Sequence, residues 1–434
     1  MGRVAVLQGP AEAVTDVGGA PATGPVTRGS VARVGVATAL TALCGYTVLY
    51  LAARALEPEG FSVFGVFWGA FGLVTGAANG LLQEATREVR SSRHLAVTTG
   101  ARTPPMRVAA MVGVVTALLI AGSSPLWSGH VFVESSGLSV VLLSVGLAGF
   151  CLHATLLGML AGVNRWTQYG SLMVTDAVIR VVVAVATFVL GWGLVGFLWA
   201  TVAGAVAWLI MLAASPSTRA AARLLTPGGV VTFLRGAAHS VTAAGASAIL
   251  VMGFPVLLKA TSEDLGAAGG VVILAVTLTR APLLVPLTAM QGNLIAHFVD
   301  QQDRRLRALV TPAVAVLALG TVGVIAAGLL GPWLLQNAFG AEYRADGALL
   351  AWLTAAAVAI ALLTLTGAAT VAAALHRAYA VGWVGATVAS VLLLLLPLDL
   401  ETRTVVALLC GPVVGIAVHL VALARADVRP VAAD

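Results

Sequence analysis

Charged residues are scarce in this sequence of 434 residues: Asp, Glu, Lys and Arg make up 10% of it, whereas hydrophobic residues make up 59%. A soluble domain carries about 25% charged residues, so this chain has too few to cover a surface that faces water. The shortage excludes a soluble enzyme, a DNA-binding protein, a secreted disulfide scaffold and a disordered linker. The mean hydropathy of +0.99 indicates that the main solvent of the chain is lipid.

Cysteines and the motifs of catalysis are also few or missing. Cys44, Cys151 and Cys410 each lie within an apolar run and are not spaced for a disulfide or a metal cluster. The sequence has no glycine-rich phosphate loop ending in Lys-Ser/Thr, no Cys-x-x-Cys and no His-Glu-x-x-His. We therefore expect no cofactor, no metal and no enzymatic activity. The isoelectric point is near 9.8, but most basic residues lie in short loops between apolar runs. We therefore attribute the excess of basic residues to membrane topology and expect no nucleic-acid partner.

Apolar runs of spanning length fill the rest of the chain. One crossing takes about 20 apolar residues, and Pro282 and Pro286 are expected to kink the eighth run, which is too long for one straight span. The runs predict twelve transmembrane helices, at 34–53, 61–83, 107–127, 138–162, 169–190, 194–214, 238–258, 266–297, 310–331, 348–373, 378–397 and 404–424.

The distribution of basic residues tests this count. With the N-terminus in the cytoplasm, eighteen of the 24 Lys and Arg fall in inside segments, and two, Arg180 and Arg280, fall within spans. The remaining four, Arg54, Lys259, Arg344 and Arg403, fall in outside loops. A missed helix would scramble this asymmetry, so the positive-inside rule predicts twelve spans with both termini cytoplasmic. We expect a multi-pass protein of the plasma membrane.

The fold class that follows is an all-α polytopic membrane protein with two six-helix lobes around a central cavity. Both lobes have the same orientation, which is a known transporter plan. The second and eighth helices support the duplication, because each follows an acidic turn and a glycine, Gly60 or Gly266, and carries a glutamine near its inner end. The predicted segments are a disordered cytoplasmic tail at 1–29, an N-lobe at 30–214, an amphipathic cytoplasmic linker at 215–237, a C-lobe at 238–425 and a cytoplasmic tail at 426–434.

Ionisable residues inside the spans are the candidates for function, because they are costly in lipid. Asp176 and Arg180 are four residues apart and share a helix face. We expect Arg180 to bind an anion in the cavity, with Asp176 holding it when the cavity is empty; a structural ion pair is the alternative. Arg280 is either a second cavity cation, the counterpart of Arg180, or a donor to a carbonyl freed by Pro282. Because Arg binds phosphate in a bidentate manner, two such cations would suit a pyrophosphate.

Other polar residues form a wider candidate set for substrate binding. Arg33 begins the first helix and is placed either to reach the interface or to guard the inner mouth of the cavity. Amides near the inner ends of the second and eighth helices suit a sugar or hold helices together; they are Asn79, Gln83, Gln291 and Asn293. His153 and His419 lie in apolar helices, where we expect each to hydrogen-bond a neighbour.

Several strings together resemble one family. Residues 52–64, 266–270, 279–283 and 334–344 are similar, in order and spacing, to segments of Wzx-type polysaccharide flippases. These proteins belong to the multidrug/oligosaccharidyl-lipid/polysaccharide exporter superfamily. The resemblance covers about residues 30–425. Strongly cationic members carry more deep basic residues than this chain, which has Arg180 and Arg280 clearly at depth.

The resemblance implies a substrate and a mechanism. Members flip polyprenyl-pyrophosphate-linked saccharides across the plasma membrane for cell-surface polysaccharide biosynthesis, as two lobes rock about a cavity that opens to alternate sides. Expected partners are the lipid-linked saccharide, membrane lipids, and glycosyltransferases or a polymerase.

Two other functions stay open at this point. The first is a cation-coupled exporter of small molecules or drugs with the same superfamily fold, which would place acids in the cavity. The second is a membrane-embedded polysaccharide polymerase, which would have a large outer loop, or a scaffold for glycosyltransferases. Asp176, the single acid within the predicted spans, has an arginine neighbour, and the longest outer loops are about ten to fifteen residues, so the flippase is favoured.

Overall fold

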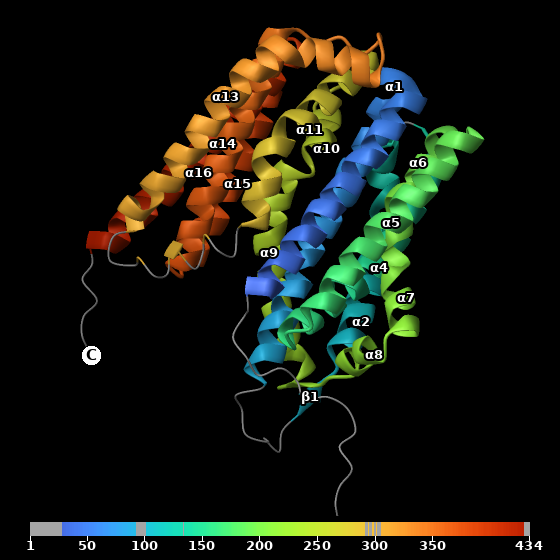
Figure 1. Cartoon of the computed structure of the whole chain (residues 1–434), viewed down its shortest axis with the longest axis vertical. Helices are drawn as coiled ribbons and strands as arrows, with labels where there is room; N and C mark the ends of the chain where they lie inside the picture. Colours follow the sequence, from blue (N-terminus) through green and yellow to red (C-terminus); the bar gives the residue numbers. More distant parts are fainter. Residues whose placement is uncertain are drawn as a thin grey trace, which may run out of the picture.

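Helices make up almost all of the computed structural model, which describes residues 28–92, 101–132, 134–290, 294, 297–298, 301 and 305–428 (Figure 1). The first half holds α1 (Arg28–Ser91), α2 (Pro105–Ser123), η1 (Ser124–Leu126), α3 (Ser128–Val131), α4 (Ser136–Gly162), α5 (Trp166–Leu190), α6 (Gly193–Ala203), η2 (Gly204–Val206) and α7 (Ala207–Ala214). The second half holds α9 (Val230–Val251), α10 (Phe254–Ala260), α11 (Gly266–Ala289), α13 (Arg305–Phe339), α14 (Gly347–Ala372), α15 (His376–Leu394) and α16 (Leu400–Val428).

The helix α1 is two membrane spans joined by a sharp break. Its 64 residues would extend about 96 Å if straight, three times the thickness of the hydrocarbon core. Glu57 has φ 56° and ψ 173°, outside the helical region, and Pro58 follows it. Figure 1 shows α1 turning back on itself at this point. The segment α1 therefore crosses the membrane twice, once on each side of Glu57.

The structure supports the twelve spans expected from the sequence. Among the described residues, ten helices are long and apolar enough to cross a membrane, and the bent pair α9 and α10 provides an eleventh. The break at Glu57 turns α1 from one crossing into two, which brings the total to twelve.

The segment between the halves differs from the expected amphipathic linker at 215–237. It contains a short helix, α8 (Pro216–Ala222), and a strand, β2 (Thr226–Pro227), that pairs antiparallel with β1 (Arg102–Thr103). The next helix already begins at Val230, eight residues before the expected start of the seventh span, and α9 bends by 66° into α10. Gly228 at φ 91° and Pro227 break the helix that periodicity alone predicted.

The chain termini at 1–27 and 429–434 lie outside the described residues, and so does most of the loop after α11. Both Pro282 and Pro286 lie inside α11.

A backbone repeat relates the two halves. The turn between α4 and α5 has Asn164 at φ 58°, and the turn between α14 and α15 has Ala374, 210 residues later, at φ 59°. The hydrogen bonds that close the two turns match with the same offset. For example, Arg165 N–H donates to Leu160 O in the first turn, and Leu375 N–H donates to Thr370 O in the second. The fourth and fifth spans of the first half therefore correspond to the fourth and fifth spans of the second.

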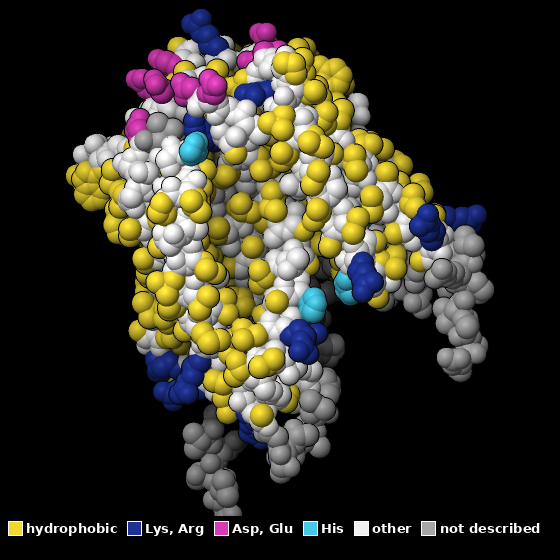
Figure 2. Space-filling model, turned by 180° about the vertical axis from the view of Figure 1, so that it is seen from behind, with side chains coloured by type: hydrophobic (Ala, Val, Ile, Leu, Met, Phe, Trp, Pro, Cys, Tyr) yellow, Lys and Arg dark blue, Asp and Glu magenta, His cyan; other side chains and the backbone are white. Residues whose placement is uncertain are grey.

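Charge divides the molecule into two ends. We call the end with the breaks at Glu57 and Gly266 the acidic end, and the end with the turns at Asn164 and Ala374 the basic end. Figure 2 shows Asp and Glu gathered at the acidic end, most Lys and Arg at the basic end, and an apolar surface between them.

A row of glycines lets the second limb of α1 pack closely on the second half. The row is Gly65, Gly69, Gly72, Gly76 and Gly80, and its contacts in the second half are Ile273, Pro255, Met252, Ala248 and Val241. Small residues at such a spacing let helix backbones approach in a membrane.

We expect Gly80→Ala to destabilise the protein by about 1–3 kcal/mol, the usual cost of overpacking. A Cβ at Gly80 would overlap the backbone at Ser240 and Val241, which cannot move without shifting α9. The matched control is Gly35→Ala on the first limb of α1, where a Cβ meets nothing within 4 Å. Thermal unfolding of the purified variants measures the difference, and equal melting of the two would show that the close approach does not matter.

Candidate functional site: buried charges and a notch at the basic end

Asp176 and Arg180 form a bidentate ion pair on one face of α5. The Arg180 Nε and Nη2 groups each donate a hydrogen bond of 3.0 Å to the Asp176 carboxylate. The two side chains are only 12% and 15% exposed. The expected i,i+4 pairing is present, and it lies within one helix instead of joining two helices.

The surroundings of this pair place it inside the first half. The Arg180 guanidinium lies 5.4 Å from the centre of the Phe71 ring on α1. Gly204, at the start of η2, faces both charged groups, and any Cβ there would overlap them. His153 of α4 interacts electrostatically with both members of the pair, stacks on Phe150, and its buried Nδ1 has no hydrogen-bond partner among the described residues.

Arg280 is buried at the bend between α9 and α10. Its Nη1 group donates to the carbonyl oxygens of Val251 at 3.1 Å and Leu250 at 3.5 Å, which are the last carbonyls of α9. Its guanidinium lies 5.3 Å from the centre of the Phe254 ring. The side chain is only 7% exposed, and its Nη2 atom has no partner among the described residues. The carbonyls that it satisfies therefore belong to another helix and are not those freed by Pro282.

Arg280 does not occupy the position in the second half that the backbone repeat relates to Arg180. The repeat offset of 210 residues relates Arg180 to Ser390 on α15, whose hydroxyl donates to Ala407 O at 2.9 Å. Gly411 faces Ser390 as Gly204 faces Arg180. Each half therefore has a glycine that packs against this position, which is occupied by Arg180 in the first half and by Ser390 in the second. The offset of 210 residues between the halves follows from the turns at Asn164 and Ala374, which the sequence alone does not mark.

The remaining candidate residues are spread over the basic end. Arg33 is exposed and donates to Thr167 Oγ1 at 3.1 Å, which ties the start of α1 to the start of α5. Asn79 is half-buried and Gln83 is exposed on the second limb of α1. Gln291 and Asn293 lie outside the described residues. Arg180 and Arg280 have different partners, Asp176 and Phe71 for the first and the end of α9 with Phe254 for the second. In the part of the chain that the structure describes, these contacts do not join the candidate set into one site.

His419 differs from His153 because both of its ring nitrogens have partners. Its Nδ1 lies 3.0 Å from Thr366 Oγ1, its Nε2 lies 3.3 Å from Tyr379 O, and its ring stacks on that of Tyr379. This agrees with the expectation of a hydrogen-bonded structural histidine.

A deep notch opens the molecule at the basic end (Figure 2). In Figure 1, α13–α16 stand on one side of it and α9 on the other. Tyr379, in the first turn of α15, lies near Ser247, which is seventeen residues beyond the start of α9. The basic-end part of α9 therefore extends about 25 Å past this contact. Arg235, His239 and Thr242 are exposed on this part of α9 at i, i+4 and i+7 and form a polar face. Of the three, Arg235 was expected in the linker at 215–237, and His239 and Thr242 in the seventh span.

The acidic end is closed by contacts between the two halves. The Tyr343 hydroxyl, in the loop before α14, donates to Ala53 O of α1 at 3.0 Å. The Tyr343 ring packs edge-on against Phe61 at 6.2 Å and lies 6.1 Å from Phe339. Burial raises the pKa of the Tyr343 phenol well above its usual value, with the nearby Glu342 and Glu57 adding to the effect. The hydroxyl therefore stays protonated and remains a donor.

We expect Tyr343→Phe to shift the population toward a form open at the acidic end by roughly fivefold, because a neutral hydrogen bond contributes about 1 kcal/mol. Spin labels at Glu59→Cys and Ala341→Cys measure the separation of the halves there. Tyr50→Phe is the control, since the Tyr50 hydroxyl has no hydrogen bond to any described residue. An unchanged distance distribution for Tyr343→Phe would contradict a role in closure.

Solved structures of transporters share this fold. An inward-facing multidrug resistance MATE family transporter of the MOP superfamily superposes with a TM-score of 0.70 and 15% identity, over 92% of this chain and 98% of that one. An outward-facing MATE family transporter gives a TM-score of 0.61 with 16% identity, over 92% and 96%. A MOP superfamily transporter from Pyrococcus furiosus, described as having a binding pocket of reversed polarity, gives 0.61 with 13% identity, over 92% and 96%.

Curated relatives match much more closely in sequence, although no protein-family model matches the chain. The uncharacterized protein Rv3630 of Mycobacterium tuberculosis is 76% identical over 93% of this chain and 94% of its own length. The uncharacterized protein Rv1510 of the same species is 72% identical over 95% and 96%. The chain therefore belongs to the family of multi-pass membrane proteins that includes Rv3630 and Rv1510, and its fold is similar to that of the solved MOP superfamily structures.

Proposed function

We propose that the protein flips a polyprenyl-pyrophosphate-linked saccharide across the bacterial plasma membrane for cell-surface polysaccharide biosynthesis. The observation that carries the proposal is the charge balance deep in the spans. Asp176 is matched by Arg180 in a bidentate pair, whereas Arg280 is buried without a carboxylate partner among the described residues. The three charges together leave a net positive interior, which favours an anionic headgroup.

Alternating access is the mechanism that fits this arrangement. The conformation described here is open at the basic end and closed at the acidic end by Tyr343. We assign the basic end to the cytoplasm by the positive-inside rule, with both termini there. A headgroup then enters the notch past Arg235 and His239, while the lipid tail stays in the bilayer beside the apolar outer surface. Separation of Tyr343 from Ala53 and closure of the notch release it on the other side.

Polar residues at the basic end supply the contacts that a saccharide needs. The amides of Asn79 and Gln83 carry both donors and acceptors for sugar hydroxyls, and we assign the same role to Gln291 and Asn293. Arg33 guards the inner mouth in this proposal. Glycosyltransferases that build the saccharide, or a polymerase that consumes it, are the expected partners.

A cation-coupled exporter of small molecules is the second candidate. Asp176 favours it, because a buried carboxylate is the group that a cation or a proton would bind. Two hydrogen bonds to Arg180 already occupy that carboxylate, so the anionic cargo remains our proposal.

Depletion of the protein in cells tests the proposal. We expect the lipid-linked saccharide to accumulate on the cytoplasmic leaflet, where a membrane-impermeant oxidant of sugars added outside cannot reach it. Normal labelling of this lipid from outside, during full depletion, would refute the flippase function.

A further inference from the structure

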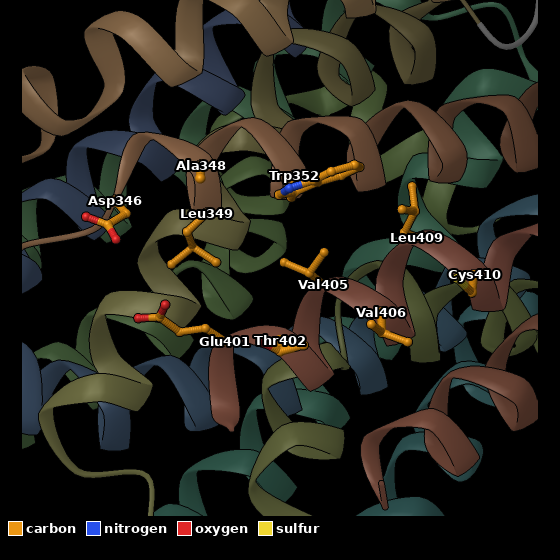
Figure 3. A pocket seen from close by; sticks show the side chains of 10 residues that line it. All are labelled: Asp346, Ala348, Leu349, Trp352, Glu401, Thr402, Val405, Val406, Leu409 and Cys410. Atoms are coloured by element: carbon orange, nitrogen blue, oxygen red, sulfur yellow. The ribbon is translucent and has the colours of Figure 1, made fainter. Parts of the chain in front are cut away.

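A groove of about 420 Å³ lies between α14 and α16, and none of the residues proposed to contact the headgroup lines it (Figure 3). One wall comes from the first two turns of α14 and the other from the first three turns of α16. The residues that line it are Asp346, Ala348, Leu349, Trp352, Glu401, Thr402, Val405, Val406, Leu409 and Cys410.

The body of the groove is apolar and about as long as one leaflet is deep. From Thr402 to Cys410, α16 advances by eight residues, about 12 Å, close to half of the 30 Å hydrocarbon core. Trp352, which is 55% exposed, forms part of one wall, and Val405 and Val406 form part of the other. The shape and depth suit one hydrocarbon chain of a lipid in the acidic-end leaflet.

The mouth of the groove is negatively charged. Figure 3 shows the carboxylates of Asp346 and Glu401 at one end and Cys410 at the opposite end. Among the described residues, neither carboxylate has an ion pair or a side-chain hydrogen bond. Two arginines are each two residues away in sequence from one of these carboxylates, and both donate elsewhere. Arg403 donates to Thr261 O and Ser262 Oγ, and Arg344 Nε donates to Ala341 O.

We propose that this groove binds an aminophospholipid, with one acyl chain along α16 and the primary ammonium of the headgroup between Asp346 and Glu401. An ammonium donates hydrogen bonds to both carboxylates and offsets one of their two negative charges. The phosphoglycerol head of an anionic lipid would bring a net negative charge to the same place, and a trimethylated choline head has no N–H to donate. The site is thus selective for phosphatidylethanolamine over phosphatidylglycerol and phosphatidylcholine.

Cys410 provides a built-in probe of occupancy. It is exposed at the apolar end of the groove, whereas Cys44 is half-buried on α1, outside it. The experiment measures alkylation of both thiols by a membrane-permeant maleimide in phosphatidylcholine nanodiscs in which part of the lipid is replaced by phosphatidylethanolamine or phosphatidylglycerol. We expect phosphatidylethanolamine to slow alkylation of Cys410 by about three- to tenfold relative to phosphatidylglycerol, as two partly exposed charge pairs allow. The rate at Cys44 should not change.

The double variant Asp346→Asn and Glu401→Gln separates the contribution of the lipid headgroup to binding from that of the acyl chain. It should lose the difference between the two lipids at Cys410. Equal protection of Cys410 by both lipids in the unmodified protein would overturn the proposal, and this comparison needs no variant. Full protection by phosphatidylethanolamine in the double variant would also overturn it, because the carboxylates would then have no part in binding.

Discussion

Replacement of Arg280 by Gln is expected to lower the rate of lipid-linked saccharide translocation by about ten- to a hundredfold, since a contact to a charged group contributes about 1.5–3 kcal/mol. The change removes the one deep positive charge that no carboxylate of the described residues neutralises. Arg280→Lys keeps that charge and should retain most of the activity. Initial rates in reconstituted vesicles, at matched protein content, measure the effect.

Arg403 offers a matched control for the structural part of this effect. Like Arg280, it donates to two backbone carbonyls, those of Thr261 and Leu394, but it lies at the acidic end. We expect Arg403→Gln to stay within about twofold of the unmodified rate, because its contacts join segments of the second half at the acidic end and take no part in the proposed headgroup site. If Arg280→Lys fell as far as Arg280→Gln, Arg280 would serve only to hold the bend of α9.

Asp176→Asn should cost about 3–5 kcal/mol of stability, because it leaves the Arg180 guanidinium buried without its counter-ion. The pair is held by two hydrogen bonds of 3.0 Å, and Gly204 packs directly against it, so the side chain of Arg180 has little room to turn toward water. Chemical unfolding in detergent, or the melting temperature, measures the loss.

The double replacement of Asp176 and Arg180 by Leu is the comparison that isolates the pair. A hydrophobic pair of similar volume often matches or exceeds the stability of a buried ion pair, so the double variant should melt close to the unmodified protein. Unfolding of Asp176→Asn at the same denaturant concentration as the unmodified protein would contradict a stabilising role for the pair.

The crossings could be predicted from sequence because hydropathy and loop charge report directly on lipid contact. The helical break at Glu57 lies within the acidic turn expected between the first two spans. The start of α9 at Val230 could not be placed, since it depends on a backbone turn at Gly228 that an apolar average does not register. The glycine row from Gly65 to Gly80 was readable from its spacing of four and three residues, but the helix against which it packs was not.

The candidate site was predictable only where it is local. Asp176 and Arg180 lie one helical turn apart, so their pairing followed from spacing alone. Arg280 binds carbonyls about thirty residues away at a bend that no sequence pattern marks. The groove at Asp346 and Glu401 joins two helices more than fifty residues apart, and its chemistry appears only when α14 and α16 are packed together.

The central claim, an anionic lipid-linked cargo, is tested most directly by a comparison within one preparation of reconstituted vesicles. Translocation of a polyprenyl-pyrophosphate-linked saccharide and of a lipophilic drug cation is measured side by side, with Arg280→Gln as the inactive reference. We predict transbilayer movement of the saccharide lipid that depends on Arg280, and no transport of the cation above empty vesicles. Transport of the cation with no movement of the saccharide lipid would contradict the flippase and establish the exporter in its place.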